Sequence, residues 1–248
     1  MSTFTKATVV LGAVTETETL RKTVHTIAEL CTAEDVAEII IGHPPKAVTK
    51  ECLAVINELA AEDFPFPVIP CPDKRPFLSS ILDAVDIAKG SHIILCPSDM
   101  ALDLKCIPEM IESAKRDPDI IASSSRFLPG CTLYEYGTIK SIINRCAQLY
   151  MRILYGVKLT DFTNPYQIAP RELYLAVNFE ETGFPFLLEM ILKPLRLGYK
   201  FREIPTNCYP RTEGKSRNSK KQMAMYLKTS LHIRFMKKKD ILLHPIGE

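Results

Sequence analysis

Residues 183–217 read GFPFLLEMILKPLRLGYKFREIPTNCYPRTEGKSR, and this stretch says more about the fold than any other part of the chain. It opens as an apolar helix that contains a single acid, Glu189. A Gly-Tyr turn at 198–199 then leads into a short strand that closes at Pro205. The loop after this strand is basic and contains Arg211, Lys215 and Arg217. A helix followed by a strand and a loop is the repeating unit of α/β proteins, whose ligands bind where parallel strands end.

The same unit repeats along the rest of the chain. Short apolar runs predict strands at 7–13, 38–41, 67–70, 92–96 and 120–123. Segments of helical periodicity alternate with them, at 50–61, 77–88, 107–115, 137–155 and 222–235. This alternation predicts one α/β domain with a central mixed, mainly parallel sheet that helices cover on both faces. A length of 248 residues and a hydrophobic fraction of 46% suffice for one large core.

Two local signals predict where helices begin and end. Thr15 with Glu18 fits a capping box, in which a hydroxyl and a carboxylate satisfy the first N–H groups of a helix. Gly90 fits the C-terminal end of the helix at 77–88.

The composition says more about the cellular compartment of the protein than about its function. A net charge of +2 names no partner, and no array of basic and aromatic residues suggests nucleic-acid binding. The eight cysteines show no CxxC spacing, which favours a reduced compartment over a disulfide scaffold. The N-terminus lacks the pattern of a signal peptide, and no run of 18 apolar residues occurs. We therefore expect a cytoplasmic protein, whose basic final helix would also suit the surface of an anionic membrane.

Three motifs resemble those of the family 2 glycosyltransferases. They are Ser124-Ser125-Arg126-Phe127, the segment from Asp161 to Tyr166, and the run that joins Glu203-Ile204-Pro205 to RTEGKSR. Within that family the pattern is most similar to the polyprenyl-phosphate sugar transferases, the group of dolichol-phosphate mannose synthase. The resemblance implies the GT-A fold over residues 1–217, with residues 218–248 as a C-terminal helix and tail of the same unit. It also implies transfer of a sugar from a nucleoside diphosphate sugar, GDP- or UDP-linked, with inversion.

The resemblance implies a donor site at the ends of several strands. Its residues would be Thr15, Glu16, His43, Arg75, Ser98, Asp99, Lys215 and Arg217. Mg²⁺ or Mn²⁺ would be held by Asp99 and Asp103, because hard cations take oxygen ligands and offset the charge of a leaving diphosphate. From the residues alone, Asp99 would also suit the cap of a turn.

The resemblance places the transfer site around Asp161, Glu189 and Arg211, and the acceptor beside Arg126 and Ser125. A guanidinium suits a phosphate acceptor because its fork binds phosphate with two hydrogen bonds. Glu189 stands out without any family argument, since a lone acid on an apolar helix is costly to bury unless it is paired. A structural pair with Arg171 is the alternative for this acid.

Other functions stay open at this point. Gly42 and Pro97 stand where relatives usually carry acids, which is the main argument for a non-catalytic binding or regulatory subunit of the same fold. The presence of Asp99, Glu189 and Arg211 argues against that alternative. A nucleotidyltransferase is disfavoured, because GAVTETET after the first strand is neither basic nor rich in glycine. The acceptor is either a lipid phosphate or a soluble molecule. The final helix packs on the core, on a membrane or on a second copy of the chain.

Overall fold

The computed structural model describes residues 2–135, 137–210, 212–213 and 220–246. Within these residues one seven-stranded sheet has the order β3-β2-β1-β4-β6-β5-β7. Its strands are β1 (Ala7–Gly12), β2 (Val36–His43), β3 (Val68–Pro72), β4 (His92–Leu95), β5 (Ile121–Ser125), β6 (Gln167–Pro170) and β7 (Phe201–Pro205). β6 runs antiparallel to β4 and β5, and the other neighbouring strands pair in parallel. The predicted mixed, mainly parallel sheet is confirmed.

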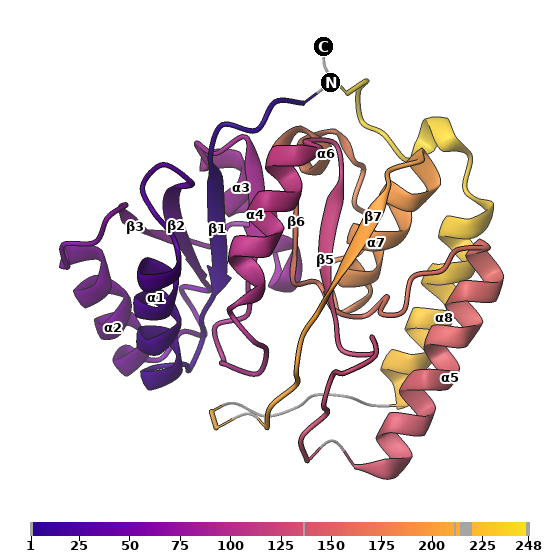
Figure 1. The fold of residues 1–248 in the computed structure, drawn as a ribbon, viewed down its shortest axis with the longest axis horizontal. Helices are drawn as coiled ribbons and strands as arrows, with labels where there is room; N and C mark the ends of the chain where they lie inside the picture. The colour runs from indigo at the N-terminus through magenta and orange to yellow at the C-terminus, as the bar shows by residue number, and fades with distance from the viewer. Residues whose placement is uncertain (1, 136, 211, 214–219, 247–248) are drawn as a thin grey trace.

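Helices cover both faces of this sheet (Figure 1). They are α1 (Glu18–Leu30), α2 (Lys50–Ala61), α3 (Ile81–Ile87), α4 (Cys106–Arg116), α5 (Thr138–Tyr155), α6 (Arg171–Ala176), α7 (Pro185–Leu197) and α8 (Lys220–Phe235). Two short 3₁₀ turns, η1 (Phe77–Ser80) and η2 (Lys238–Asp240), complete the set. One core cluster joins the sheet to α1, α2 and α4, and a second joins its other face to α3, α6 and α7.

The central strands are apolar at successive positions because both of their faces are buried. Val9 and Leu11 belong to the cluster with α1, α2 and α4, whereas Val10 belongs to the cluster on the opposite face. Successive side chains of a strand point to opposite faces, so the run VVL supplies both layers at once. This two-sided burial explains why the strands could be found from short apolar runs.

A third layer lies beyond β7, where α5, α7 and α8 meet. Figure 1 shows α5 and α8 side by side at this end of the sheet. Their shared cluster includes Met151 of α5, Leu188 and Leu192 of α7, and Ile233 of α8. One face of the final helix therefore packs on the core, which was one of the three arrangements predicted for it.

Both local predictions of helix ends are wrong. α1 begins at Glu18 after Thr17, and the Thr17 side chain makes no capping hydrogen bond. The cap comes instead from Glu213, a distant residue described below. α3 ends at Ile87, ahead of Gly90. A Cβ atom on Gly90 would lie 2.5 Å from the backbone nitrogen of Thr8, so this glycine is needed where the chain passes close to β1.

Six strands, β1 to β5 and β7, end at one side of the sheet, which we call the carboxyl edge. The antiparallel β6 ends at the opposite side. Ligands of open α/β sheets bind at the carboxyl edge. Among the described residues no helix is long and apolar enough to cross a membrane.

Candidate functional site

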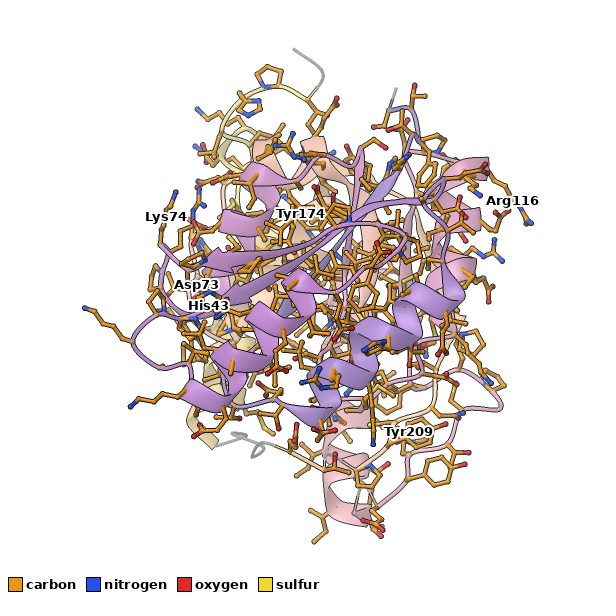
Figure 2. All side chains as sticks on the ribbon, turned by 90° about the vertical axis from the view of Figure 1, so that its left-hand side faces the viewer. His43, Asp73, Lys74, Arg116, Tyr174 and Tyr209 are labelled. Atoms are coloured by element: carbon orange, nitrogen blue, oxygen red, sulfur yellow. The ribbon has the colours of Figure 1, made fainter. Side chains whose placement is uncertain are left out.

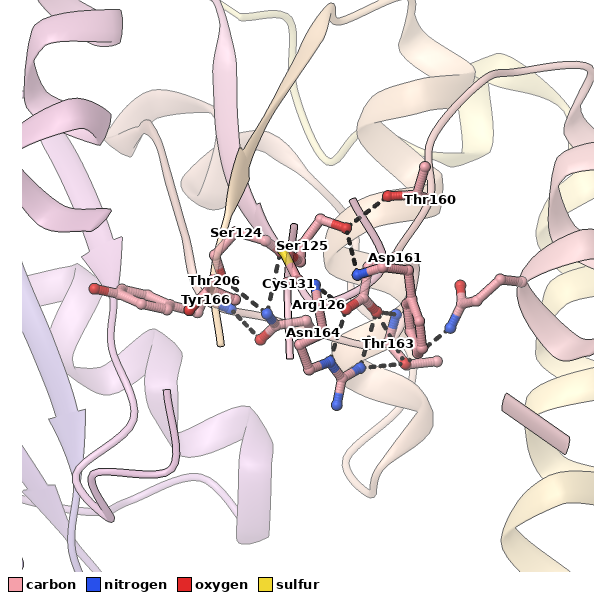
Figure 3. A network of polar contacts seen from close by, with 12 residues as sticks. Ser124, Ser125, Arg126, Cys131, Thr160, Asp161, Thr163, Asn164, Tyr166 and Thr206 are labelled. Carbon is pink, nitrogen blue, oxygen red and sulfur yellow. Dashed lines mark hydrogen bonds and ion pairs between the residues drawn. The ribbon is translucent and has the colours of Figure 1, made fainter. Parts of the chain in front are cut away.

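Arg126 and Asp161 form a buried ion pair at the carboxyl edge (Figure 3). Arg126 Nε donates to Asp161 Oδ2 at 2.7 Å, and Arg126 Nη2 donates to Oδ1 at 2.9 Å. The Asp161 side chain is fully buried, whereas Arg126 keeps a small exposed fraction. The structure thus brings together two residues that the sequence placed in separate roles. A fork-to-fork pair of this kind fixes the orientation of both groups.

The loop that carries Asp161 is held from β7. One Glu203 carboxylate oxygen accepts from the Thr160 hydroxyl at 2.7 Å and from the Asp161 N–H at 3.1 Å. The Ser125 hydroxyl lies 2.6 Å from the Thr160 hydroxyl, which links β5 to the same loop. Ser125 therefore serves as a structural link, and its predicted contact with an acceptor stays a prediction.

The Asn-Pro-Tyr segment at 164–166 follows Asp161 and is anchored to β5 (Figure 3). Asn164 donates from Nδ2 to the hydroxyl of Ser124 at 2.7 Å and to the carbonyl of Ser124 at 3.1 Å. From α5, Gln148 accepts the Phe162 N–H at 2.8 Å. Because β5, β7 and α5 all hold this loop, the Arg126–Asp161 pair is positioned before any ligand binds.

Asp99 lies in a sharp turn after β4. Its Oδ1 atom accepts from the Ala101 N–H at 3.1 Å, and Met100 has a φ of +54°, a value unusual for a residue other than glycine. The neighbouring Ser98 donates from its hydroxyl to the Gly12 carbonyl at 2.5 Å, so its side chain joins the ends of β4 and β1. Asp99 thus caps a turn at the carboxyl edge, and its role as a metal ligand stays a prediction.

Asp103 stands at the turn before α4. Its Oδ1 atom accepts from the Lys105 N–H at 3.3 Å, and its own N–H donates to the Thr206 hydroxyl at 3.2 Å. Among the described residues no cluster of three or more His, Cys, Asp and Glu side chains could hold a metal ion by itself. A cation at Asp99 would therefore need further oxygen ligands from the donor, and diphosphate oxygens have the chemistry that Mg²⁺ and Mn²⁺ require.

Glu16 folds back on its own loop. Its carboxylate accepts from the Val14 N–H at 2.7 Å and from the Thr15 N–H at 2.9 Å. Both N–H groups belong to the loop that contains Glu16, so these hydrogen bonds do not connect Glu16 to the end of another strand. The predicted donor roles of Thr15 and Glu16 stay predictions.

Glu213, from the basic loop after β7, caps the first turn of α1. It accepts from the N–H and hydroxyl of Thr17, both at 3.0 Å, and from the Thr19 hydroxyl at 2.6 Å. Burial acts to raise the pKa of Glu213, but these hydrogen bonds prevail and lower it to about 2. A negative charge is also favoured at a helix N-terminus. Glu213 thereby contacts the first turn of α1 across a separation of 194 residues in the sequence.

Arg75 forms ion pairs with two acids of α3. Its Nη1 atom lies 2.6 Å from Asp83 Oδ1 and 2.7 Å from Asp86 Oδ2. Asp83 Oδ2 also accepts from the Lys74 and Arg75 N–H groups at 2.7 and 2.8 Å. The guanidinium thus forms part of a clamp on its own loop, and its contact with a donor phosphate stays a prediction.

Glu189 is buried on α7, and its partner is Lys193, one helical turn away. Lys193 Nζ lies 2.6 Å from Glu189 Oε1, and both side chains are buried. Burial raises the pKa of Glu189, which Lys193 and the N–H groups of Glu180 and Glu181 oppose. The alternative pair with Arg171 is wrong, because Arg171 donates to the carbonyls of Val85 and Asp86. A place for Glu189 in the transfer site stays a prediction.

A cavity of about 190 Å³ lies beside the Arg126–Asp161 pair. Its lining combines two cations with apolar and polar groups, namely Arg145, Arg152, Phe127, Leu149, Gln148 and Thr160. Gln148 and Thr160 also hold the Asp161 loop, so the cavity and the ion pair share a wall. The two arginines were missed from the sequence, because nothing in the pattern of the helix at 137–155 set them apart.

Arg211, Lys215 and Arg217 lie outside the described residues. Glu203 and Glu213 belong to motifs that the sequence had already singled out, but their partners at Thr160 and Thr17 could not be read from spacing. His43 lies at the end of β2 and is buried.

The sequence model of the family described as Glycosyl transferase family 2 matches residues 8–177, which is more than half of the chain. The chain belongs to glycosyl transferase family 2, and the predicted family is confirmed.

The names of two curated relatives refer to phosphorylated polyprenols. The undecaprenyl-phosphate mannosyltransferase of Micrococcus luteus is 30% identical over 116 residues, which are 46% of this chain and 47% of that protein. The polyprenol monophosphomannose synthase of Mycolicibacterium smegmatis is 24% identical over 143 residues, 56% of this chain and 49% of that protein. The matches thus span about half the length of these relatives.

Solved structures share the fold. Glucosyl-3-phosphoglycerate synthase of Mycobacterium tuberculosis, in complex with Mn²⁺, UDP and glucosyl-3-phosphoglycerate, has a TM-score of 0.67 and 18% identity. The match covers 93% of this chain and 80% of that one. The same enzyme with Mg²⁺ and UDP has a TM-score of 0.66 at 18% identity, over 93% of this chain and 79% of that one. The GT-A fold predicted from the sequence is confirmed.

Proposed function

We propose that this chain transfers a sugar from a nucleoside diphosphate sugar to a polyprenyl phosphate at a membrane surface. The observation that carries the proposal is the cavity beside the Arg126–Asp161 pair, because it sets Arg145 and Arg152 next to apolar side chains. A guanidinium pair suits a phosphate, and an apolar wall suits the first units of a lipid chain. The named specificity of the two curated relatives supports the same class of acceptor.

The surface next to the cavity suits a membrane. α5 and α8 lie side by side (Figure 1), and neither sequence contains an acidic residue. Both helices expose large apolar side chains, among them Ile139 (76% exposed), Ile142, Ile153 (74%), Met223, Leu227 and Phe235 (75%). Apolar side chains among basic ones bind anionic lipid surfaces through burial and charge together. A lipid phosphate held at Arg145 would then lie at the same surface as its tail.

The donor would bind at the carboxyl edge of β1 to β4. Asp99 would hold Mg²⁺ or Mn²⁺ together with the diphosphate oxygens, and the solved relatives with UDP and these cations support that choice. When bound, the cation supplies charge neutralisation on the departing diphosphate. Arg211, Lys215 and Arg217 would add positive charge to the same group.

The transfer requires no strong base. An oxygen of the acceptor phosphate, already ionised, forms a bond to the anomeric carbon of the sugar while the bond from that carbon to the diphosphate oxygen breaks. The electron pair leaves with the nucleoside diphosphate, and the configuration inverts. Arg126, fixed by Asp161, orients the acceptor side, so its task is positioning and charge stabilisation.

Transfer from UDP- and GDP-linked sugars to undecaprenyl phosphate in vesicles tests the acceptor site. Arg145→Ala with Arg152→Ala is expected to raise KM for the lipid phosphate about tenfold or more, and to leave the affinity for the nucleotide within twofold. Arg116→Ala, which removes an exposed arginine in the last turn of α4, is the matched control. An unchanged KM in the double variant would contradict the proposed site.

Two alternatives rest on specific observations. A soluble phosphate acceptor is supported by the solved relatives that form glucosyl-3-phosphoglycerate, and 3-phosphoglycerate in the same assay would reveal it. A non-catalytic subunit is supported by Gly42 and Pro97, and would bind nucleotide without any transfer. If the apolar helices instead join two copies of the chain, sedimentation without vesicles would give a dimer.

A further inference from the structure

A groove of about 710 Å³ lies where the end of α8 meets η2. This end of α8 is on the side of the molecule away from the carboxyl edge (Figure 1). Leu231 and Phe235 line the groove, and their side chains are 44% and 75% exposed. Both belong to the exposed apolar side chains of α8, the helix proposed to face lipid. The groove is therefore continuous with that surface.

Two acids from distant segments of the chain also line this groove. Glu180 lies in the loop after α6, and Asp240 is the last residue of η2. The Asn178 N–H donates to the Ile241 carbonyl at 2.8 Å, and Asn178 Nδ2 donates to the Asp240 carbonyl at 3.4 Å. Because these bonds join the two segments, both carboxylates are held at the same groove before any ligand binds.

The charges that line the groove are unequally paired. Glu180 Oε2 lies 3.2 Å from Nζ of the buried Lys193 and 3.3 Å from Nε2 of His232. Lys237 and Asp240 lie in one turn, since the Asp240 N–H donates to the Lys237 carbonyl at 2.9 Å. Within the part of the chain that the structure describes, neither of these two side chains forms an ion pair. The groove thus offers one anion and one cation to a ligand, beside an apolar wall.

We propose that this groove binds phosphatidylethanolamine, a phospholipid whose head group carries both a phosphate and a primary ammonium. The ammonium donates to the carboxylates of Asp240 and Glu180, and the phosphate accepts from Lys237. The acyl chains lie along Leu231 and Phe235. A choline head group fits less well, because its quaternary ammonium has no N–H to donate. The proposal rests on the proposed contact of α5 and α8 with a membrane, and it does not depend on sugar transfer.

A lipid bound here would give the membrane contact a second fixed point. The acceptor cavity lies beside α5, next to the Arg126–Asp161 pair at the carboxyl edge. The groove lies at the far end of α8 (Figure 1). Two separate lipid sites on one surface determine how the chain is oriented on the bilayer, whereas an apolar surface alone leaves it free to rotate.

Binding of the full chain to two kinds of vesicle tests this site. Both contain the same fraction of phosphatidylglycerol, and the remainder is phosphatidylethanolamine in one and phosphatidylcholine in the other. The ratio of the two dissociation constants cancels the general attraction of basic residues to anionic lipid, which is equal in both. We expect the wild type to bind the ethanolamine vesicles at least about fivefold more tightly. Asp240→Asn should bring this ratio to within about twofold of one, because an amide carries no negative charge for the ammonium.

A second variant and two controls separate the site from a general effect of charge. Lys237→Ala should lower the ratio as Asp240→Asn does, because the head group loses its phosphate contact. Lys239→Ala removes a cation of the same tail that does not line the groove. Arg116→Ala removes a cation whose side chain points away from the molecule at the end of α4 (Figure 2). Both controls should keep the ratio of the wild type.

Each outcome decides a separate point. A wild-type ratio within twofold of one would overturn the proposal and leave sugar transfer and general membrane binding standing. A ratio that stays at the wild-type value in both Asp240→Asn and Lys237→Ala would also overturn it, because the lipid would then act through the packing of the bilayer. If the chain binds neither vesicle, both this site and the proposed membrane contact are wrong. Transfer to undecaprenyl phosphate in detergent, measured in parallel, then tests the proposed reaction by itself.

Discussion

Asp161 is fully buried and charged, so its side chain depends on Arg126 for compensation. Removing one partner of a buried pair leaves the other charge without a counterion, at a cost of about 3–5 kcal/mol. We expect Asp161→Asn to lower the free energy of unfolding by about 3 kcal/mol in urea denaturation. The exposed Asp63→Asn should change it by less than about 0.5 kcal/mol. Equal stability of the two variants would mean that the pair contributes nothing.

Glu213 gives a pH dependence with a definite sign. Its pKa in the folded chain, about 2, lies below the ordinary value of 4.5. The stabilisation by this carboxylate is therefore complete above pH 4.5 and is lost as the pH falls toward 2. The melting temperature of Glu213→Gln should lie below that of the wild type at pH 7, and the difference should shrink between pH 4.5 and 3. A difference that stays constant or grows over this range would contradict the cap on α1.

The motifs around these residues were predictable from the sequence, but their partners were not. Arg126 and Asp161 were each singled out by a short pattern, yet 35 residues separate them and only the fold shows that they pair. Glu213 caps α1 across 194 residues, which is why the local capping box at Thr15 was wrong. The pattern around Glu189 indicated a costly burial, and the structure supplies Lys193 as the reason it is tolerated.

Helix α7 carries its two buried charges as a pair. Lys193→Met would leave the Glu189 charge uncompensated and should cost about 3 kcal/mol of unfolding free energy. Adding Glu189→Leu removes that charge and should recover at least half of the loss, measured by urea denaturation. No recovery would contradict the pairing. Transfer activity of the double variant then decides the predicted role, since a stable but inactive protein would support a place for Glu189 in the transfer site.

α5 and α8 present the surface proposed to face lipid. Ile153→Glu adds a charge at a position that is 74% exposed, so folding should not suffer. We expect at least tenfold weaker binding to vesicles that contain phosphatidylglycerol, because a carboxylate both repels the anionic lipid and removes buried apolar area. Ile87→Glu on α3, at another exposed isoleucine, is the control and should bind like the wild type. Equal binding by both variants would contradict a membrane role for α5.

Six of the seven strands were predictable, because apolar runs mark strands buried on both faces and helices alternate with them, whereas residues 167–170 were interpreted as part of a loop. The order of the strands and the antiparallel β6 were not predictable, since Gln167–Pro170 is short and its pairing depends on segments far away. The exposed apolar face of α5 could not be told from a core-facing one, because periodicity shows a stripe without showing what covers it. The division into residues 1–217 and a C-terminal tail stays a prediction, supported by the packing of α8 on α7 and α5.

Detection of a glycosylated lipid phosphate by mass spectrometry is the direct test of sugar transfer from a nucleotide to a polyprenyl phosphate. The full chain would be incubated with undecaprenyl phosphate in vesicles, UDP- and GDP-linked sugars and Mn²⁺, with Asp99→Asn in parallel. We expect one product with the mass of the lipid phosphate plus one hexose, and at least a hundredfold less of it from Asp99→Asn. Binding of a nucleotide by the wild type with no lipid product from either donor would contradict it and would favour a soluble acceptor or a non-catalytic subunit.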